Sequence, residues 1–135
     1  MTFEEMKSKY CGANIRKKHK DEEHKLQVSM INWFRLQYPS MHHNLFAIPN
    51  GGRRDAATGR RLKDEGVLAG VSDLILLKSN RCYGALLIET KTRKGIQRDS
   101  QKEWESKITA DGYKYVIVRS LDEFIEVVTD YLKDA

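Results

Sequence analysis

Apolar side chains near the start of the chain repeat every three or four positions, which is the spacing of one face of a helix. The pattern predicts a helix over residues 21–38. Asp21 is its expected N-cap, and Pro39 is expected to end it because proline restricts the residue before it. The inner face of this helix is predicted to consist of Leu26, Met30, Trp33, Phe34 and Gln37.

Four short apolar runs further along the chain predict strands at residues 44–48, 73–77, 83–91 and 113–119. Helical spacing predicts three more helices at residues 58–65, 99–111 and 121–133. Thr58 is the expected cap of the first of these, and Gly66 and Gly112 are expected to stop the first two. The inner faces of the last two helices are expected to contain Trp104, Ile108, Phe124, Val127, Val128 and Tyr131.

The order of these elements favours an α/β fold. A strand, a helix and a second strand follow one another over residues 83–119, which favours a parallel, right-handed crossover. The short connection at Ser79-Asn80 favours an antiparallel hairpin. We therefore expect a single compact domain at residues 21–135, with a central mixed sheet flanked by helices, preceded by a basic arm or loose helix at residues 1–20.

The composition is that of one folded domain. The chain has 135 residues, of which 40% are hydrophobic and 32% charged, enough for one core but not comfortably for two. No apolar run approaches the ~20 residues of a membrane span. Residues 1–20 lack the apolar core of a signal peptide, so a cytoplasmic protein is expected. Cys11 and Cys82 lack metal-ligand spacing and are expected to be reduced thiols.

Positive residues gather in three clusters, and the net charge is +5. The clusters lie at residues 16–20, 53–63 and 93–102. Basic side chains that neutralise phosphates release counterions, so such clusters favour binding to nucleic acid. A solvated surface explains the first cluster equally well, but the other two flank candidate site residues. The residues expected to contact a nucleic acid backbone are Arg53, Arg54, Arg60, Arg61, Lys63, Arg93, Lys94 and Arg98.

Two of the predicted strands carry carboxylates. Asp73 opens one apolar run, and Glu89 and Lys91 close the next. Because strand side chains alternate, Glu89 and Lys91 share a face while Thr90 points away. If Asp73 lies beside them, the carboxylates suit Mg²⁺ or Mn²⁺, with the backbone carbonyl of Thr90 as a further ligand. Lys91 would orient water or stabilise charge on a phosphate. The alternative is a strand-end acid and a surface Glu–Lys pair.

Three further features are candidates for the same site. Glu23 lies one helical turn from Gln27 and could supply a third carboxylate for the metal, although a solvent-facing helix start is an equally good interpretation. Gln101 could bond to the lysine or to a phosphate, or it could cap a turn. Asn50 and Gly51 lie in a segment of small residues that would let a nucleic acid backbone approach, or that forms only a turn.

These motifs, taken in order, resemble the VRR-NUC domain, a branch of the PD-(D/E)xK nuclease superfamily. The resemblance runs from about Glu22 to Leu132. Two positions depart from the family pattern: Ser72 stands where the family usually has proline, and Ser120 stands where it has the second arginine of Val-Arg-Arg. The matching motifs are Glu23-x-x-x-Gln27, Ile48-Pro49-Asn50-Gly51-Gly52, Leu62-Lys63-x-x-Gly66-Val67, Gly70-Val71-Ser72-Asp73-Leu74, Ile88-Glu89-Thr90-Lys91, Gln101-x-x-Trp104, and Gly112-Tyr113 before Val116-Ile117-Val118-Arg119.

The resemblance implies a restriction-endonuclease-like core and cleavage of DNA that depends on Mg²⁺ or Mn²⁺. It makes Asp73 and Glu89 the metal ligands, Lys91 the catalytic lysine, and Glu23 and Gln101 supporting site residues. Short members resemble Holliday-junction resolvases, tend to be dimers and are common in phages and bacteria. Branched or flapped DNA and a homodimer are therefore expected. Two alternatives stay open: a catalytically idle nucleic-acid-binding module, and a metal-independent assembly protein.

Overall fold

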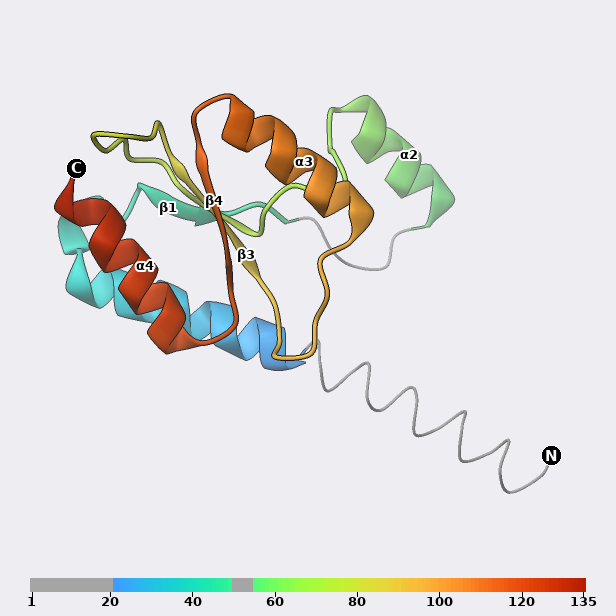
Figure 1. Cartoon of the computed structure of the whole chain (residues 1–135). Helices are drawn as coiled ribbons and strands as arrows, with labels where there is room; N and C mark the ends of the chain where they lie inside the picture. Colours follow the sequence, from blue (N-terminus) through green and yellow to red (C-terminus); the bar gives the residue numbers. More distant parts are fainter. Residues whose placement is uncertain (1–20, 50–54) are drawn as a thin grey trace, which may run out of the picture.

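A four-stranded sheet forms the centre of the fold (Figure 1) in the computed structural model, which describes residues 21–49 and 55–135. Its strands are β1 (Leu45–Ala47), β2 (Leu74–Leu76), β3 (Leu86–Thr90) and β4 (Lys114–Val118), and they lie side by side in this order. β2 is antiparallel to both β1 and β3, whereas β3 and β4 are parallel. The expected mixed sheet, antiparallel hairpin and parallel pairing across the crossover are therefore confirmed.

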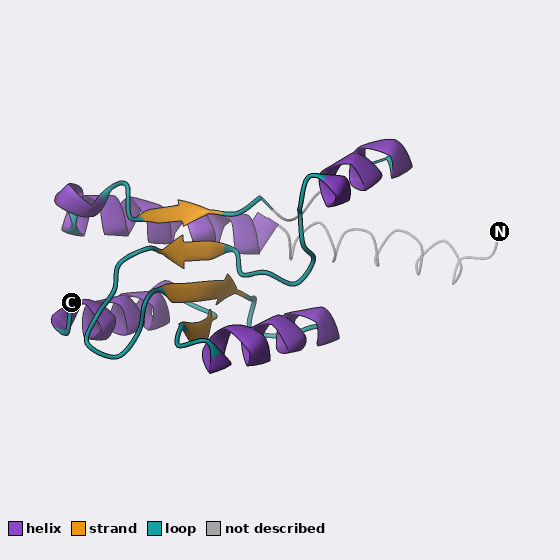
Figure 2. Ribbon diagram, turned by 90° about the horizontal axis from the view of Figure 1, so that it is seen from above, coloured by secondary structure: helices purple, strands orange, loops and turns teal. Residues whose placement is uncertain are grey.

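Helices cover both faces of this sheet. A helix over residues 21–37, called the first helix below, leads into the short 3₁₀ helix η1 (Pro39–Met41). The first helix and α4 (Leu121–Lys133) lie on one face, and α3 (Asp99–Ala110) lies on the other (Figure 1). Figure 2 shows α2 (Ala56–Asp64) standing apart from the sheet, and none of its residues is buried. No helix in the described ranges is long and apolar enough to cross a membrane.

The alternation of side chains along β3 divides the core into two parts. Leu86 and Ile88 face the first helix and α4, where they pack with Met30, Phe34 and other fully buried residues. Leu87 faces α3 and packs in a smaller cluster with Ala85, Tyr115, Trp104 and Ile108. All five residues of β3 are buried, as expected for a strand covered on both sides. The next residue of the Leu87 face is Glu89.

Local signals set the ends of the helices. The N-cap of α2 is Asp55, whose side chain accepts a hydrogen bond from the Thr58 N–H at 2.7 Å, so the prediction of Thr58 as the cap is wrong. That hydrogen bond lowers the pKa of Asp55. Gly66 and Gly112 follow α2 and α3 with φ angles of 100° and 98°, and both predicted stops are confirmed. Asp21 already lies within the helix and is therefore not its N-cap.

Other boundaries differ from the prediction in detail. The strand predicted from residue 83 starts at Leu86, because the Asn80 side chain accepts hydrogen bonds from the Cys82 and Tyr83 N–H groups and holds a turn there. Gln37, expected on the inner face of the first helix, is exposed, and Val127 is only partly buried. The predicted arm at residues 1–20 lies outside the described residues.

Candidate active site

The end of β3 carries the centre of the candidate site. Glu89 and Lys91 point to one face of the strand, and the Lys91 Nζ lies 3.6 Å from the Glu89 Oε1. Both residues are buried, with 3% of Glu89 and 7% of Lys91 exposed. The alternative of a surface Glu–Lys pair is therefore wrong. A charged pair enclosed in the protein is costly unless further groups satisfy it, so its neighbours decide what it does.

Asp73 lies beside this pair, directly before β2. Its Oδ2 accepts a hydrogen bond from the Thr90 N–H at 2.8 Å, where the antiparallel pairing of β2 and β3 has just ended. This hydrogen bond follows directly after the backbone hydrogen bonds between β2 and β3. It brings the Asp73 carboxylate next to Glu89. Ser72, the residue in place of the family's proline, is fully buried and donates from its Oγ to the Leu74 carbonyl at 3.1 Å. This hydrogen bond fastens the turn into β2.

Gln101 connects α3 to the carboxylates. Its Nε2 donates to the Glu89 Oε1 at 2.8 Å, and its Oε1 accepts from the Arg98 N–H at 2.8 Å. Gln101 is the one buried residue of α3, since 6% of it is exposed. Gln101 therefore caps the start of α3, which is one of the roles expected for it. Its amide is hydrogen-bonded to Glu89 and not to Lys91.

Burial raises the pKa of both carboxyl groups, and the charge of Asp73 raises that of Glu89 further. Burial raises the pKa of Asp73, against the opposing effects of the Thr90 N–H and the Lys91 charge. Burial, and then the charge of Asp73, raise the pKa of Glu89 to about 7, although Lys91 opposes both. Lys91 and the more distant Arg98 therefore do not fully compensate the two carboxylates, and a further positive charge placed between them would stabilise their ionised forms.

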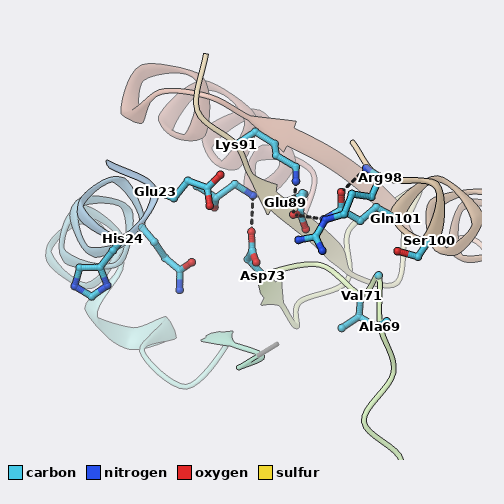
Figure 3. A pocket seen from close by; sticks show the side chains of 13 residues that line it. Glu23, His24, Ala69, Val71, Asp73, Glu89, Lys91, Arg98, Ser100 and Gln101 are labelled. Carbon is cyan, nitrogen blue, oxygen red and sulfur yellow. Dashed lines mark hydrogen bonds and ion pairs between the residues drawn. The ribbon is translucent and has the colours of Figure 1, made fainter. Parts of the chain in front are cut away.

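The carboxylates line a cavity of about 520 Å³ at this end of the sheet. Glu23 and Gln27 reach it from the first helix, so the interpretation that places them in the site is favoured over a solvent-facing helix start. Figure 3 shows Glu23 directed toward Asp73 and Glu89 from the opposite wall. The complete lining consists of Glu23, His24, Gln27, Ala69, Gly70, Val71, Asp73, Glu89, Thr90, Lys91, Arg98, Ser100 and Gln101.

The donor set fits a hard divalent cation. The Glu89 Oε2 is buried and has no hydrogen-bond partner among the described residues, so this carboxylate oxygen retains its capacity to accept from, or bind, a ligand. Carboxylate oxygens are the ligands that Mg²⁺ and Mn²⁺ prefer, and Mg²⁺ is usually held by one or two of them plus water and substrate. No group of three or more Asp, Glu, His or Cys side chains in the described ranges is placed to hold a metal. Asp73 and Glu89 are the two carboxylates that the structure brings together at this point of the cavity.

The basic residues expected at the site separate into two groups. Arg98 lines the cavity. Arg60, Arg61 and Lys63 lie on α2, outside the cavity lining, where Arg61 pairs with Glu65 at 3.2 Å. Arg93 and Lys94 are exposed on the loop after β3. Four expected nucleic acid contacts, Asn50, Gly51, Arg53 and Arg54, lie outside the described residues.

Two features of the site were missed in the sequence. Ser100 lines the cavity, and Gly70, with φ 91°, packs so closely on it that a Cβ would collide with the Ser100 carbonyl oxygen. Arg119 fastens the loop after β3 through bonds from its Nη1 to the carbonyls of Thr92 and Gly95, both at 2.7 Å. Only the Val118-Arg119 motif at the end of an apolar strand could have pointed to this arginine.

The fold and the site together define a class of α/β proteins with paired carboxylates and a lysine at the end of central strands. The sequence matches the family model of the VRR-NUC domain over residues 9–122. A solved structure described as a VRR_NUC domain protein is similar, with a TM-score of 0.73 and 26% identity over 84% of this chain and 89% of that one. No curated protein matches the chain.

The chain belongs to the VRR-NUC family. This is a family of nucleases, and membership implies a divalent metal ion as the general cofactor and DNA as the substrate. The resemblance predicted from the ordered motifs is thereby confirmed.

Proposed function

We propose that this protein is an endonuclease that hydrolyses DNA phosphodiester bonds with Mg²⁺ or Mn²⁺, and that branched or flapped DNA is a preferred substrate. The observation that carries the proposal is the convergence of Asp73, Glu89 and Lys91 in one cavity, with the Glu89 Oε2 unpartnered. A binding module that had lost catalysis would have no need to keep two mutually repelling carboxylates buried together.

Each residue of the cavity has a proposed role that follows from its chemistry. Asp73 and Glu89 would hold the metal, with the Thr90 carbonyl as a further ligand, and the metal would supply Lewis-acid activation of water and phosphate. Lys91, whose Nζ lies 3.6 Å from the Glu89 Oε1, would orient the attacking water and stabilise negative charge on the phosphate. Gln101 fixes the Glu89 carboxylate. Glu23, across the cavity, is proposed to bind water on the open side.

The basic surface would hold the rest of the DNA. Arg93 and Lys94 follow the catalytic lysine on an exposed loop, and Arg60, Arg61 and Lys63 lie on the exposed helix α2. Exposed cations of this kind bind phosphates without reading sequence. A homodimer is expected from the family resemblance, and it would let two such cavities act on one branched DNA. Analytical ultracentrifugation of the protein tests for the dimer.

Replacing Lys91 tests the proposed activity. Lys91→Ala is expected to lower the cleavage rate by roughly 10²–10⁴-fold because the charge next to the phosphate is lost. Binding to DNA is expected to persist, since the outer basic residues remain. The substrates are labelled linear duplex, single strand, flap and four-way junction, each with Mn²⁺, Mg²⁺ or EDTA. Lys107→Ala, which removes an exposed lysine from the far end of α3, is the matched control.

The results separate the proposal from its alternatives. Cutting that needs metal and disappears in Lys91→Ala would establish the nuclease, and the preferred substrate would identify the DNA form. Binding without cutting of any substrate would favour the idle binding module. Unimpaired turnover of Lys91→Ala would remove this lysine from the mechanism.

A further inference from the structure

Arg98 brings a second positive side chain into the cavity. It is the residue before α3, where its backbone is extended and its N–H is held by the Gln101 Oε1 at 2.8 Å. Figure 3 shows its guanidinium directed into the cavity beside Gln101, toward Asp73 and Glu89. Arg98 is exposed to solvent, but its backbone is held in place and its side chain is directed toward the carboxylates.

The guanidinium has no partner within the described part of the chain, neither a hydrogen bond nor an ion pair. The other groups around it are engaged: Lys91 pairs with Glu89, and both ends of the Gln101 amide are bonded. The charge of Arg98 lowers the pKa of Asp73 from a distance, but the guanidinium contacts neither acid directly. The five N–H donors of Arg98 are therefore not engaged by the described part of the protein, at the solvent-exposed edge of the cavity.

A phosphodiester is the ligand whose shape fits these donors. The planar fork of a guanidinium binds two oxygens of a phosphate at once, which an ammonium cannot do. Arg98 also stands at the N-terminus of the 12-residue helix α3, where the helix dipole favours an anion. A phosphate held there would lie on the Gln101 side of the cavity, next to the carboxylates and the lysine.

We propose that Arg98 is a catalytic residue that binds the two non-bridging oxygens of the scissile phosphodiester. This rests on the proposed nuclease function and adds the residue that holds the reacting group. In the reaction, the water oxygen forms a bond to phosphorus and the bond from phosphorus to the leaving oxygen breaks. The water loses a proton and the leaving oxygen gains one. Negative charge increases on the non-bridging oxygens in the transition state, where Arg98 stabilises it most.

Single-turnover cleavage at saturating DNA tests this role. Arg98→Ala is expected to slow the chemical step by roughly 10²–10³-fold, as for loss of one charge-stabilising donor. DNA affinity in EDTA should fall much less, because only one phosphate contact is removed. Arg98→Lys should remain slow, since lysine cannot bind two oxygens side by side. Free guanidinium ion is expected to restore part of the rate to Arg98→Ala, which a purely structural arginine would not allow.

Three controls make the result interpretable. Arg81→Ala removes an exposed arginine before β3, away from the cavity, and should cut like the parent protein. Lys91→Ala should not be rescued by guanidinium. Thermal unfolding shows whether each variant is folded. Cleavage by Arg98→Ala at the parent rate, while Lys91→Ala is inactive, would overturn the role of Arg98 and leave the nuclease intact.

A second measurement does not depend on cleavage. The Nε–H resonance of Arg98, identified by its absence in Arg98→Lys, is followed by NMR as a short duplex is added in EDTA. A saturable shift is expected, and inorganic phosphate should compete with it. An unchanged resonance would overturn the proposal even if the protein cuts DNA. If the parent cuts nothing, the nuclease is rejected, whereas a shift would still support Arg98 as a phosphate ligand.

Discussion

At the scale of single residues, Gln101 shows how the site is held in place. Its amide donates to the Glu89 Oε1 and accepts from the Arg98 N–H, so one side chain joins β3 to the start of α3. A carboxylate that binds metal is usually oriented by such an outer hydrogen bond. Glutamine suits this position because it supplies one donor and one acceptor from the same group.

Gln101→Leu removes both hydrogen bonds while keeping a similar volume. We expect its affinity for Mn²⁺ to fall by about 10–100-fold, since the outer partner of a ligand is lost. The free energy of unfolding should also decrease, by about 1–3 kcal/mol, because buried polar groups are left unpaired. Isothermal titration calorimetry with Mn²⁺ and urea unfolding measure the two effects.

Gln97→Leu is the matched control for this variant. Gln97 donates to the Glu105 Oε1 at 2.8 Å and to the Tyr115 hydroxyl at 3.3 Å. The Gln97→Leu variant therefore also loses hydrogen bonds, but the substituted residue does not line the cavity. Its affinity for Mn²⁺ should match that of the parent. Equal affinities in Gln101→Leu and the parent would show that Glu89 needs no help from α3.

At the scale of elements, the loop between β3 and α3 depends on Arg119 at the end of β4. Two carbonyls of this loop, at Thr92 and Gly95, accept from one nitrogen of the guanidinium. Gly95 also packs closely on the Lys91 side chain, where a Cβ would lie 3.3 Å from the Lys91 Cδ. The loop that carries Arg93 and Lys94 is thereby held against the Lys91 side chain.

Arg119→Ala should loosen this loop without changing Asp73 and Glu89, the proposed metal ligands. We expect faster amide hydrogen exchange over residues 92–97 and a cleavage rate lower by about tenfold, because even small misplacement of reacting groups is costly. Affinity for Mn²⁺ should be retained. Arg35→Ala, at an exposed position of the first helix, is the control and should show neither effect. Unaltered exchange over residues 92–97 would contradict the proposed function of Arg119.

The departure from the Val-Arg-Arg motif also has a local explanation. Ser120 is the N-cap of α4, and its hydroxyl accepts from the Glu123 N–H at 3.1 Å. Serine is among the best residues for this position. The first arginine of the motif is present and holds the loop, whereas the second position serves the helix in this chain.

Most elements could be predicted from the sequence because their signals are local. The periodic pattern of α4 predicted its limits, Leu121–Lys133, and Gly66 and Gly112 predicted helix ends through positive φ angles. The start of β3 was misplaced because the Asn80 side chain holds a turn that apolar spacing does not record. The contacts of Arg119 join residues more than twenty positions apart, so no local pattern shows them.

At the scale of the whole molecule, the candidate site is an assembly of separate segments. The first helix, the approach to β2, the end of β3 and the start of α3 each contribute to one cavity. The sequence predicted that Asp73, Glu89 and Lys91 would converge, because strand alternation and pairing decide where they point. It could not predict the inward direction of Arg98 or the isolation of the Glu89 Oε2, which depend on how α3 packs on the sheet.

A metal bound in this cavity would connect the two central strands, so it should stabilise the entire fold. At a Mn²⁺ concentration about 100 times the dissociation constant, the expected gain in unfolding free energy is about 2.7 kcal/mol. For a domain of this size the thermal midpoint should rise by roughly 10 °C. Asp73→Asn and Glu89→Gln should abolish the rise, whereas Asp111→Asn, an exposed acid paired with Lys107, should keep it. An equal rise in all four proteins would place the metal elsewhere, because a ligand stabilises only the state in which its own side chains are assembled.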